Sequence, residues 1–85
     1  MANLYTGNLT VSDEFKTLSS LTNITFTNGT TYTIQVYNPC YLREGTTGKG
    51  FLITNSTPIK YVAGSDSLYI GKFGSYNDIT TNIAE

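Results

Sequence analysis

A chain of 85 residues has room for one domain, and with one cysteine and no histidine it cannot form an internal disulfide, a histidine-dependent nucleophilic site or a histidine-containing zinc site. Its net charge of −1 comes from five basic and six acidic residues scattered along the chain, so we expect no nucleic-acid partner. Hydrophobic residues make up 39% of the chain and charged residues only 13%, and the abundant Thr, Ser, Asn and Gly favour a folded all-β domain over a disordered chain.

The first residues do not resemble a signal peptide. Residues 1–6 contain neither the basic region nor the apolar run of a signal peptide, and no later stretch is long and apolar enough to span a bilayer. We therefore expect synthesis in the cytosol and no membrane partner.

One segment near the N-terminus departs from a β pattern. Ser12 followed by Asp13 and Glu14 is typical of a helix N-cap with acidic residues in the first turn, and Phe15 and Leu18 could share one face. This pattern predicts a short helix or helical turn near residues 13–20.

The rest of the chain alternates with a period of two. The clearest strand is 31–36, where Tyr32, Ile34 and Val36 share one face. Asn28-Gly29 supplies the positive φ angles of a tight turn, so the runs on either side of it should be antiparallel neighbours. Across the chain, alternation predicts these core residues: Leu9, Val11, Ile24, Phe26, Ile34, Val36, Phe51, Ile53, Leu68, Ile70, Ile79 and Ile83.

The short, even spacing of these runs predicts the fold class. Turn residues interrupt the chain at 38–39, 45–50, 55–58, 64–66 and 74–78. The pattern is typical of an all-β domain, a small antiparallel β-sandwich or partly open barrel of six to eight short strands. We expect the C-terminal run 79–83 to be a strand that closes or edges a sheet.

A glycine-rich segment invites comparison with a phosphate-binding loop. The spacing around Lys49 requires a glycine where Arg43 stands and Ser or Thr where Gly50 stands, and the run that follows is typical of a strand. We interpret 45–50 as a flexible turn between strands and expect no cofactor.

The acidic residues and the cysteine suggest no catalytic centre. Most acidic residues fall in predicted turns, where we expect their carboxylates to be solvated. The alternative interpretations are a hydrolytic carboxylate pair and a calcium site at Asp66 or Asp78. Cys40 has no histidine to activate it, so we expect a small buried side chain without redox or metal chemistry. The chain is therefore predicted to be no enzyme and to hold no metal.

Three of the seven tyrosines are candidate partner contacts. Tyr37, Tyr41 and Tyr76 fall near turns, where an aromatic ring with a polar tip can dock on another protein. Packing at the edge of the core is an equally good reading of the same residues, because tyrosine is a favourable strand residue.

Several strand and turn segments resemble a known group of proteins. These are 29–35, 50–53, 64–70 and 82–85, and their order and spacing are similar to those of small β-sandwich accessory and decoration proteins of tailed bacteriophage virions. The resemblance covers most of the chain from residue 20 onward. It implies a non-enzymatic virion component, made in the bacterial cytoplasm, that attaches to the head, its fibres or the tail.

The resemblance and the small size of the domain point to assembly. With no disulfide or metal to stabilise it, such a domain is expected to bury apolar surface against copies of itself or other virion proteins, as a homo-oligomer or a lattice-bound subunit. The alternative function is a carbohydrate-binding or cell-surface-binding β-sandwich module.

Overall fold

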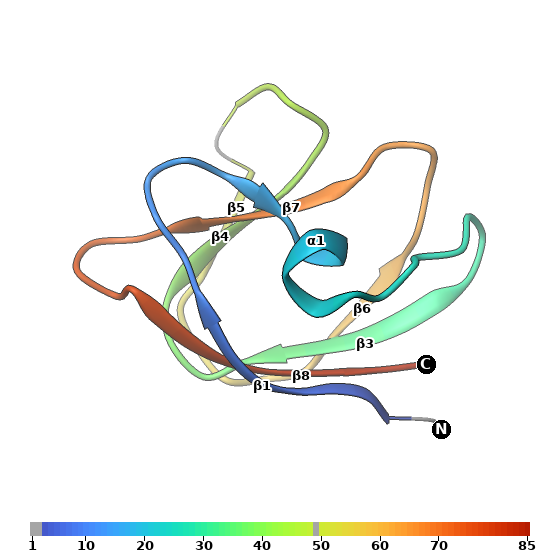
Figure 1. Ribbon diagram of the computed structural model, residues 1–85, viewed down its shortest axis with the longest axis horizontal. Helices are drawn as coiled ribbons and strands as arrows, with labels where there is room; N and C mark the ends of the chain where they lie inside the picture. The colour runs from blue at the N-terminus through green and yellow to red at the C-terminus, as the bar shows by residue number, and fades with distance from the viewer. Residues whose placement is uncertain (1–2, 49) are drawn as a thin grey trace.

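The computed structural model describes residues 3–48 and 50–85, and within them eight strands form two four-stranded antiparallel sheets facing each other (Figure 1). The first sheet has the order β1 (Asn3–Thr10), β8 (Asp78–Ala84), β3 (Thr31–Val36) and β6 (Ile59–Val62). The second has the order β2 (Lys16–Thr17), β7 (Leu68–Lys72), β4 (Cys40–Glu44) and β5 (Phe51–Ile53). The predicted all-β sandwich is confirmed.

The core lies between the sheets and comes mainly from the inward side chains of the strands, together with Leu18 of helix α1 (Leu18–Thr22). Most predicted core residues are buried there, and three are partly buried against it: Ile24, Phe26 and Ile53. The prediction for Phe51 is wrong, since its side chain is 78% exposed. Phe51 belongs to β5, a three-residue edge strand that pairs only with β4 among the described strands, so no neighbouring strand covers its outer side.

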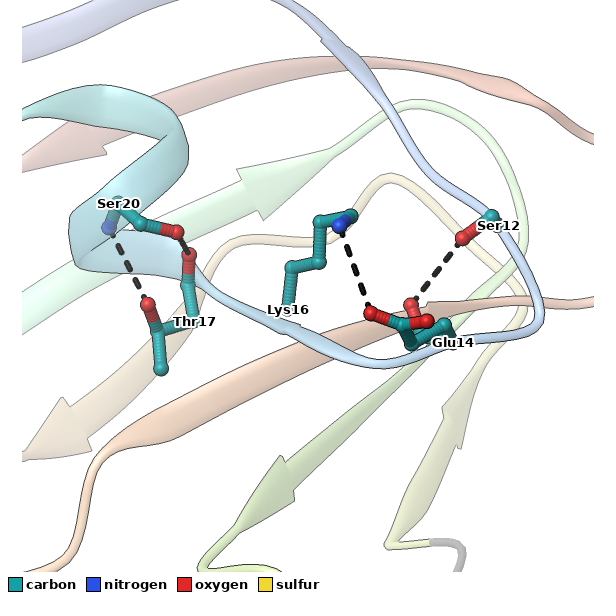
Figure 2. A network of polar contacts seen from close by, with 5 residues as sticks. All are labelled: Ser12, Glu14, Lys16, Thr17 and Ser20. Atoms are coloured by element: carbon teal, nitrogen blue, oxygen red, sulfur yellow. Dashed lines mark hydrogen bonds and ion pairs between the residues drawn. The ribbon is translucent and has the colours of Figure 1, made fainter.

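The helix begins later than the sequence pattern predicted. Helix α1 (Leu18–Thr22) is capped by Thr17, whose Oγ1 accepts a 3.3 Å hydrogen bond from the Ser20 amide, whereas the Ser12 hydroxyl donates to the Glu14 carbonyl (Figure 2). Residues 16 and 17 cannot be helical because they pair with β7 as strand β2. In Figure 1, α1 lies between the two layers of the sandwich.

The segment before Asn28-Gly29 is not a strand, so the predicted hairpin there is wrong. The turn instead ties β3 to the end of β6, because the Gly29 amide donates to the Ala63 carbonyl at 2.8 Å. Phe26 reaches the core from irregular backbone and packs edge-on against Tyr32, with ring centroids 4.8 Å apart. The Tyr32 hydroxyl accepts a 2.7 Å bond from the Thr27 amide, which holds the segment in place without a β ladder.

The C-terminal strand is central rather than peripheral. β8 pairs with β1 on one side and with β3 on the other, and its inward side chains Ile79, Thr81 and Ile83 are fully buried. The prediction of a strand at 79–83 is confirmed, but its predicted position at the edge of a sheet is wrong. Within the described residues the edge strands are β1 and β6 in one sheet and β2 and β5 in the other.

Candidate functional site

The three candidate tyrosines do not form one patch. Tyr37 is exposed on the first sheet, where its hydroxyl donates to Gln35 Oε1 at 2.9 Å and accepts from Asn82 Nδ2 at 3.0 Å. Tyr41 is half-buried on the outer face of the second sheet, with its ring centroid 5.7 Å from that of Phe73. Tyr76 is exposed in the turn after β7, and its amide donates to the Phe73 carbonyl. Tyr41 and Tyr76 thus both contact Phe73, whereas Tyr37 lies against the first sheet.

An arginine lies between aromatic rings on the outer face of the second sheet. The Arg43 guanidinium carbon lies 4.2 Å from the ring centre of Phe15 and 5.0 Å from that of Tyr69. Gly71 leaves room for the Phe15 ring, because a Cβ there would come within 2.6 Å of it. Arg43 is thereby held in a fixed position by cation–π contacts.

The same arginine shapes the loop between β4 and β5. Arg43 Nε donates to the Gly45 carbonyl at 2.9 Å, and Nη1 donates to the Gly48 carbonyl at 3.1 Å. Sequence reasoning noted Arg43 only as a mismatch to a phosphate loop and predicted a flexible turn. The described part of the loop is instead held to the sheet by these two hydrogen bonds from Arg43. The phosphate-loop comparison depended on Lys49, which lies outside the described residues.

The two sheets leave an apolar groove on the side where β5 and β6 form their edges. The groove has a volume of about 400 Å³, and strands of both sheets line it. We use the name β5–β6 edge for this groove together with the exposed residues Phe51, Leu52 and Val62. Phe51 is 78% exposed, Val62 60% and Leu52 42%. The run of three consecutive apolar residues at 51–53 was the available signal, because a strand with one solvated face alternates.

A smaller and more polar pocket of about 250 Å³ lies next to this edge. We call it the hydroxyl pocket. Helix α1 and the irregular segment that follows it form one side of the pocket, and the connection from β6 to β7 forms the other. The residues that line it are Ser19, Thr25, Phe26, Tyr61, Ala63, Gly64, Ser65, Asp66, Ser67 and Leu68. Sequence reasoning considered Asp66 only as an alternative calcium ligand. It could not place the hydroxyl side chains together, since they come from separate segments.

A hydrogen bond between the sheets borders the hydroxyl pocket. The Tyr61 hydroxyl of β6 donates to Glu44 Oε2 of β4 at 3.3 Å. Burial raises the pKa of Tyr61 above its ordinary value of 10.0, and the charge and hydrogen bond of Glu44 raise it further. The tyrosine is therefore a neutral hydrogen-bond donor at neutral pH.

The acidic residues are not gathered into a metal-binding cluster within residues 3–48 and 50–85, where no three His, Cys, Asp or Glu side chains could jointly hold an ion. Asp66 precedes β7, whereas Asp78 begins β8 and accepts a 3.4 Å hydrogen bond from the Thr10 hydroxyl.

Cys40 is fully buried, as predicted, and burial raises the pKa of its thiol to about 11. At neutral pH the side chain is a protonated thiol in the core, and a thiol in that state is a poor nucleophile.

The described part of the chain contains no helix that is long and apolar enough to cross a membrane. Comparison of the chain with protein-family models, curated proteins and solved structures found no match. The resemblance to virion proteins stays a prediction.

Proposed function

We propose that the chain is a non-enzymatic structural component of a bacteriophage virion, which docks in repeated copies through the β5–β6 edge. The observation that carries the proposal is the exposure of Phe51, a large apolar side chain on an edge strand beside an apolar groove. Burying a phenylalanine side chain at an interface stabilises the complex by about 1.5–3 kcal/mol.

The exposed strands add a second reason for docking. β5 and β6 are short edge strands, and edge strands offer backbone N–H and C=O groups to another chain. When two copies meet around a two-fold axis, the Phe51 side chain of each can enter the groove of the other. The same surface then supplies both halves of the contact.

Repetition compensates for the small size of this interface. A surface centred on Phe51, Leu52 and Val62 gives only weak binding for one copy. On a symmetric particle, many copies reinforce one another through their neighbours, and avidity replaces single-site affinity. The low net charge of the chain means that neighbouring copies repel one another little.

The test is co-sedimentation of the purified chain with tailed-phage particles assembled without it. We expect saturable binding with a fixed number of copies per particle, and strong loss of binding for Phe51→Ser. Leu4→Ser is the matched control, because Leu4 is an exposed apolar residue on β1, the opposite edge of the first sheet.

The three tyrosines belong in the same assay. Tyr37→Ala, Tyr41→Ala and Tyr76→Ala, tested one at a time, determine whether the contact extends beyond the β5–β6 edge. Equal binding by wild type and Phe51→Ser would refute this edge as the docking surface. Absence of particle binding by the wild-type chain would argue against the virion proposal itself.

A further inference from the structure

Several polar side chains that line the hydroxyl pocket form no hydrogen bond with the rest of the described protein. Within residues 3–48 and 50–85, neither the Asp66 carboxylate nor the side-chain hydroxyls of the pocket's serines and Thr25 take part in a hydrogen bond to another protein group. These residues line one small cavity and come from three segments of the chain, and all of them except Ser19 are exposed. They are therefore available to a ligand that can both donate and accept hydrogen bonds.

The charge of the lining excludes one class of ligand. Asp66 lies in the pocket and Glu44 lies beside it, since a Cβ added at Gly64 would be 3.5 Å from Glu44 Oε2. No lysine or arginine lines the pocket among the described residues. A phosphate, a carboxylated sugar or a nucleic acid would be repelled there.

The pocket also has an apolar wall. Phe26 and Tyr61 meet edge to face with centroids 6.3 Å apart, and both are only partly buried. A volume of about 250 Å³ is below the 300–1,000 Å³ typical of sites for drug-sized ligands, so the site suits a single small ring.

We propose that the hydroxyl pocket binds one neutral sugar ring. The Asp66 carboxylate accepts hydrogen bonds from two neighbouring sugar hydroxyls, and such charge-assisted bonds are about twice as strong as neutral ones. The serine and threonine hydroxyls bond to the remaining sugar hydroxyls, and the aromatic wall contacts the apolar face of the ring.

Two other ligands fit the site less well. An organic ammonium ion would use the carboxylate and the rings, but it has few groups that could bond to the four serine and threonine hydroxyls of the lining. Calcium takes six to eight oxygen ligands, commonly including several carboxylates, and no three acidic residues gather among the described residues.

The proposal is independent of particle docking, because Asp66 lines the hydroxyl pocket and not the groove of the β5–β6 edge. Its test is a titration of the labelled chain, followed by two-dimensional NMR, with the methyl glycosides of glucose, galactose, mannose and N-acetylglucosamine. We expect binding of at least one sugar in the millimolar range, with shifts of the amides of residues 64–68. Asp66→Ala should weaken it by about tenfold or more.

Asp78→Ala is the matched control, since Asp78 is an exposed acid that does not line the pocket, and it should bind like wild type. The proposal is overturned if none of the four sugars shifts these amides, or if Asp66→Ala binds as well as wild type. Shifts of the same amides by choline or calcium in the absence of sugar binding would also overturn it.

Discussion

Tyr61 and Glu44 connect the two sheets on the side where the sandwich is open, through a 3.3 Å hydrogen bond from the tyrosine hydroxyl to Glu44 Oε2. Tyr61 belongs to β6 and Glu44 ends β4, so the bond holds the first sheet to the second. Tyr61 lines both the groove and the hydroxyl pocket. This contact therefore supports both candidate surfaces.

Removing the Tyr61 hydroxyl should have a small effect and removing the ring a larger one. We expect Tyr61→Phe to lower the free energy of unfolding by no more than about 1 kcal/mol, the value of one partly solvated hydrogen bond. Tyr61→Ala also loses packing against Phe26 and the core and should cost about 2–4 kcal/mol. Urea denaturation of the two variants measures both values, and equal losses would show that the ring packing contributes nothing.

Two glycines of the β4–β5 loop should differ in their tolerance of alanine. Gly50 has φ +77°, and a Cβ there would overlap the Leu42 carbonyl oxygen and the Arg43 backbone. Gly48 has φ +79° with nothing within 4 Å. We expect Gly48→Ala to cost about 1–2 kcal/mol from backbone strain alone. Gly50→Ala should cost clearly more and lower the melting temperature further; similar melting temperatures would contradict this.

Arg43 should be irreplaceable by lysine. Lysine keeps the charge but lacks the planar, forked group that reaches the Gly45 and Gly48 carbonyls while lying over Phe15. We predict that Arg43→Lys and Arg43→Ala both speed hydrogen exchange of the Gly45 amide, which donates to the Ser67 carbonyl at 2.9 Å. Lys60→Ala is the control, and unchanged exchange in Arg43→Lys would disprove the role of the guanidinium.

Cys40 should make the stability of the domain fall at alkaline pH. Burial raises the pKa of its thiol from 9.0 to about 11, so between these values the unfolded thiol loses its proton while the folded one keeps it. The stabilisation is fully present below pH 9 and is lost as pH rises toward 11, by up to about 3 kcal/mol. The free energy of unfolding of Cys40→Ala should depend less steeply on pH in this window, whereas equal slopes would contradict the burial effect.

Local alternation was sufficient to predict the fold class and most of the core. Ile34 and Val36, or Ile79 and Ile83, face inward because a strand with one buried face places every second side chain there. Alternation could not predict that Phe51 is exposed, because exposure depends on where β5 lies in its sheet. The same applies to β8, whose central position depends on pairing with two strands distant in sequence.

The candidate surfaces were harder to predict than the fold. The hydroxyl pocket combines Ser19 with Asp66, and the stacked Arg43 combines Phe15 with Tyr69, so each depends on contacts between separate segments. The cap of α1 was misassigned for a related reason. Ser12 has the right side chain for a cap, but pairing of residues 16 and 17 with β7 delays the helix to Leu18.

The most direct test of assembly through the β5–β6 edge is sedimentation velocity of the wild-type chain and Phe51→Ser over a wide range of concentrations. We predict that the wild-type chain forms a species of defined mass larger than 9.3 kDa as concentration rises. Phe51→Ser should remain a folded monomer under the same conditions, because it lacks the exposed side chain that we propose enters the groove of a second copy. A wild-type chain that stays monomeric throughout, or a Phe51→Ser variant that associates equally well, would contradict the proposed self-assembly through this edge.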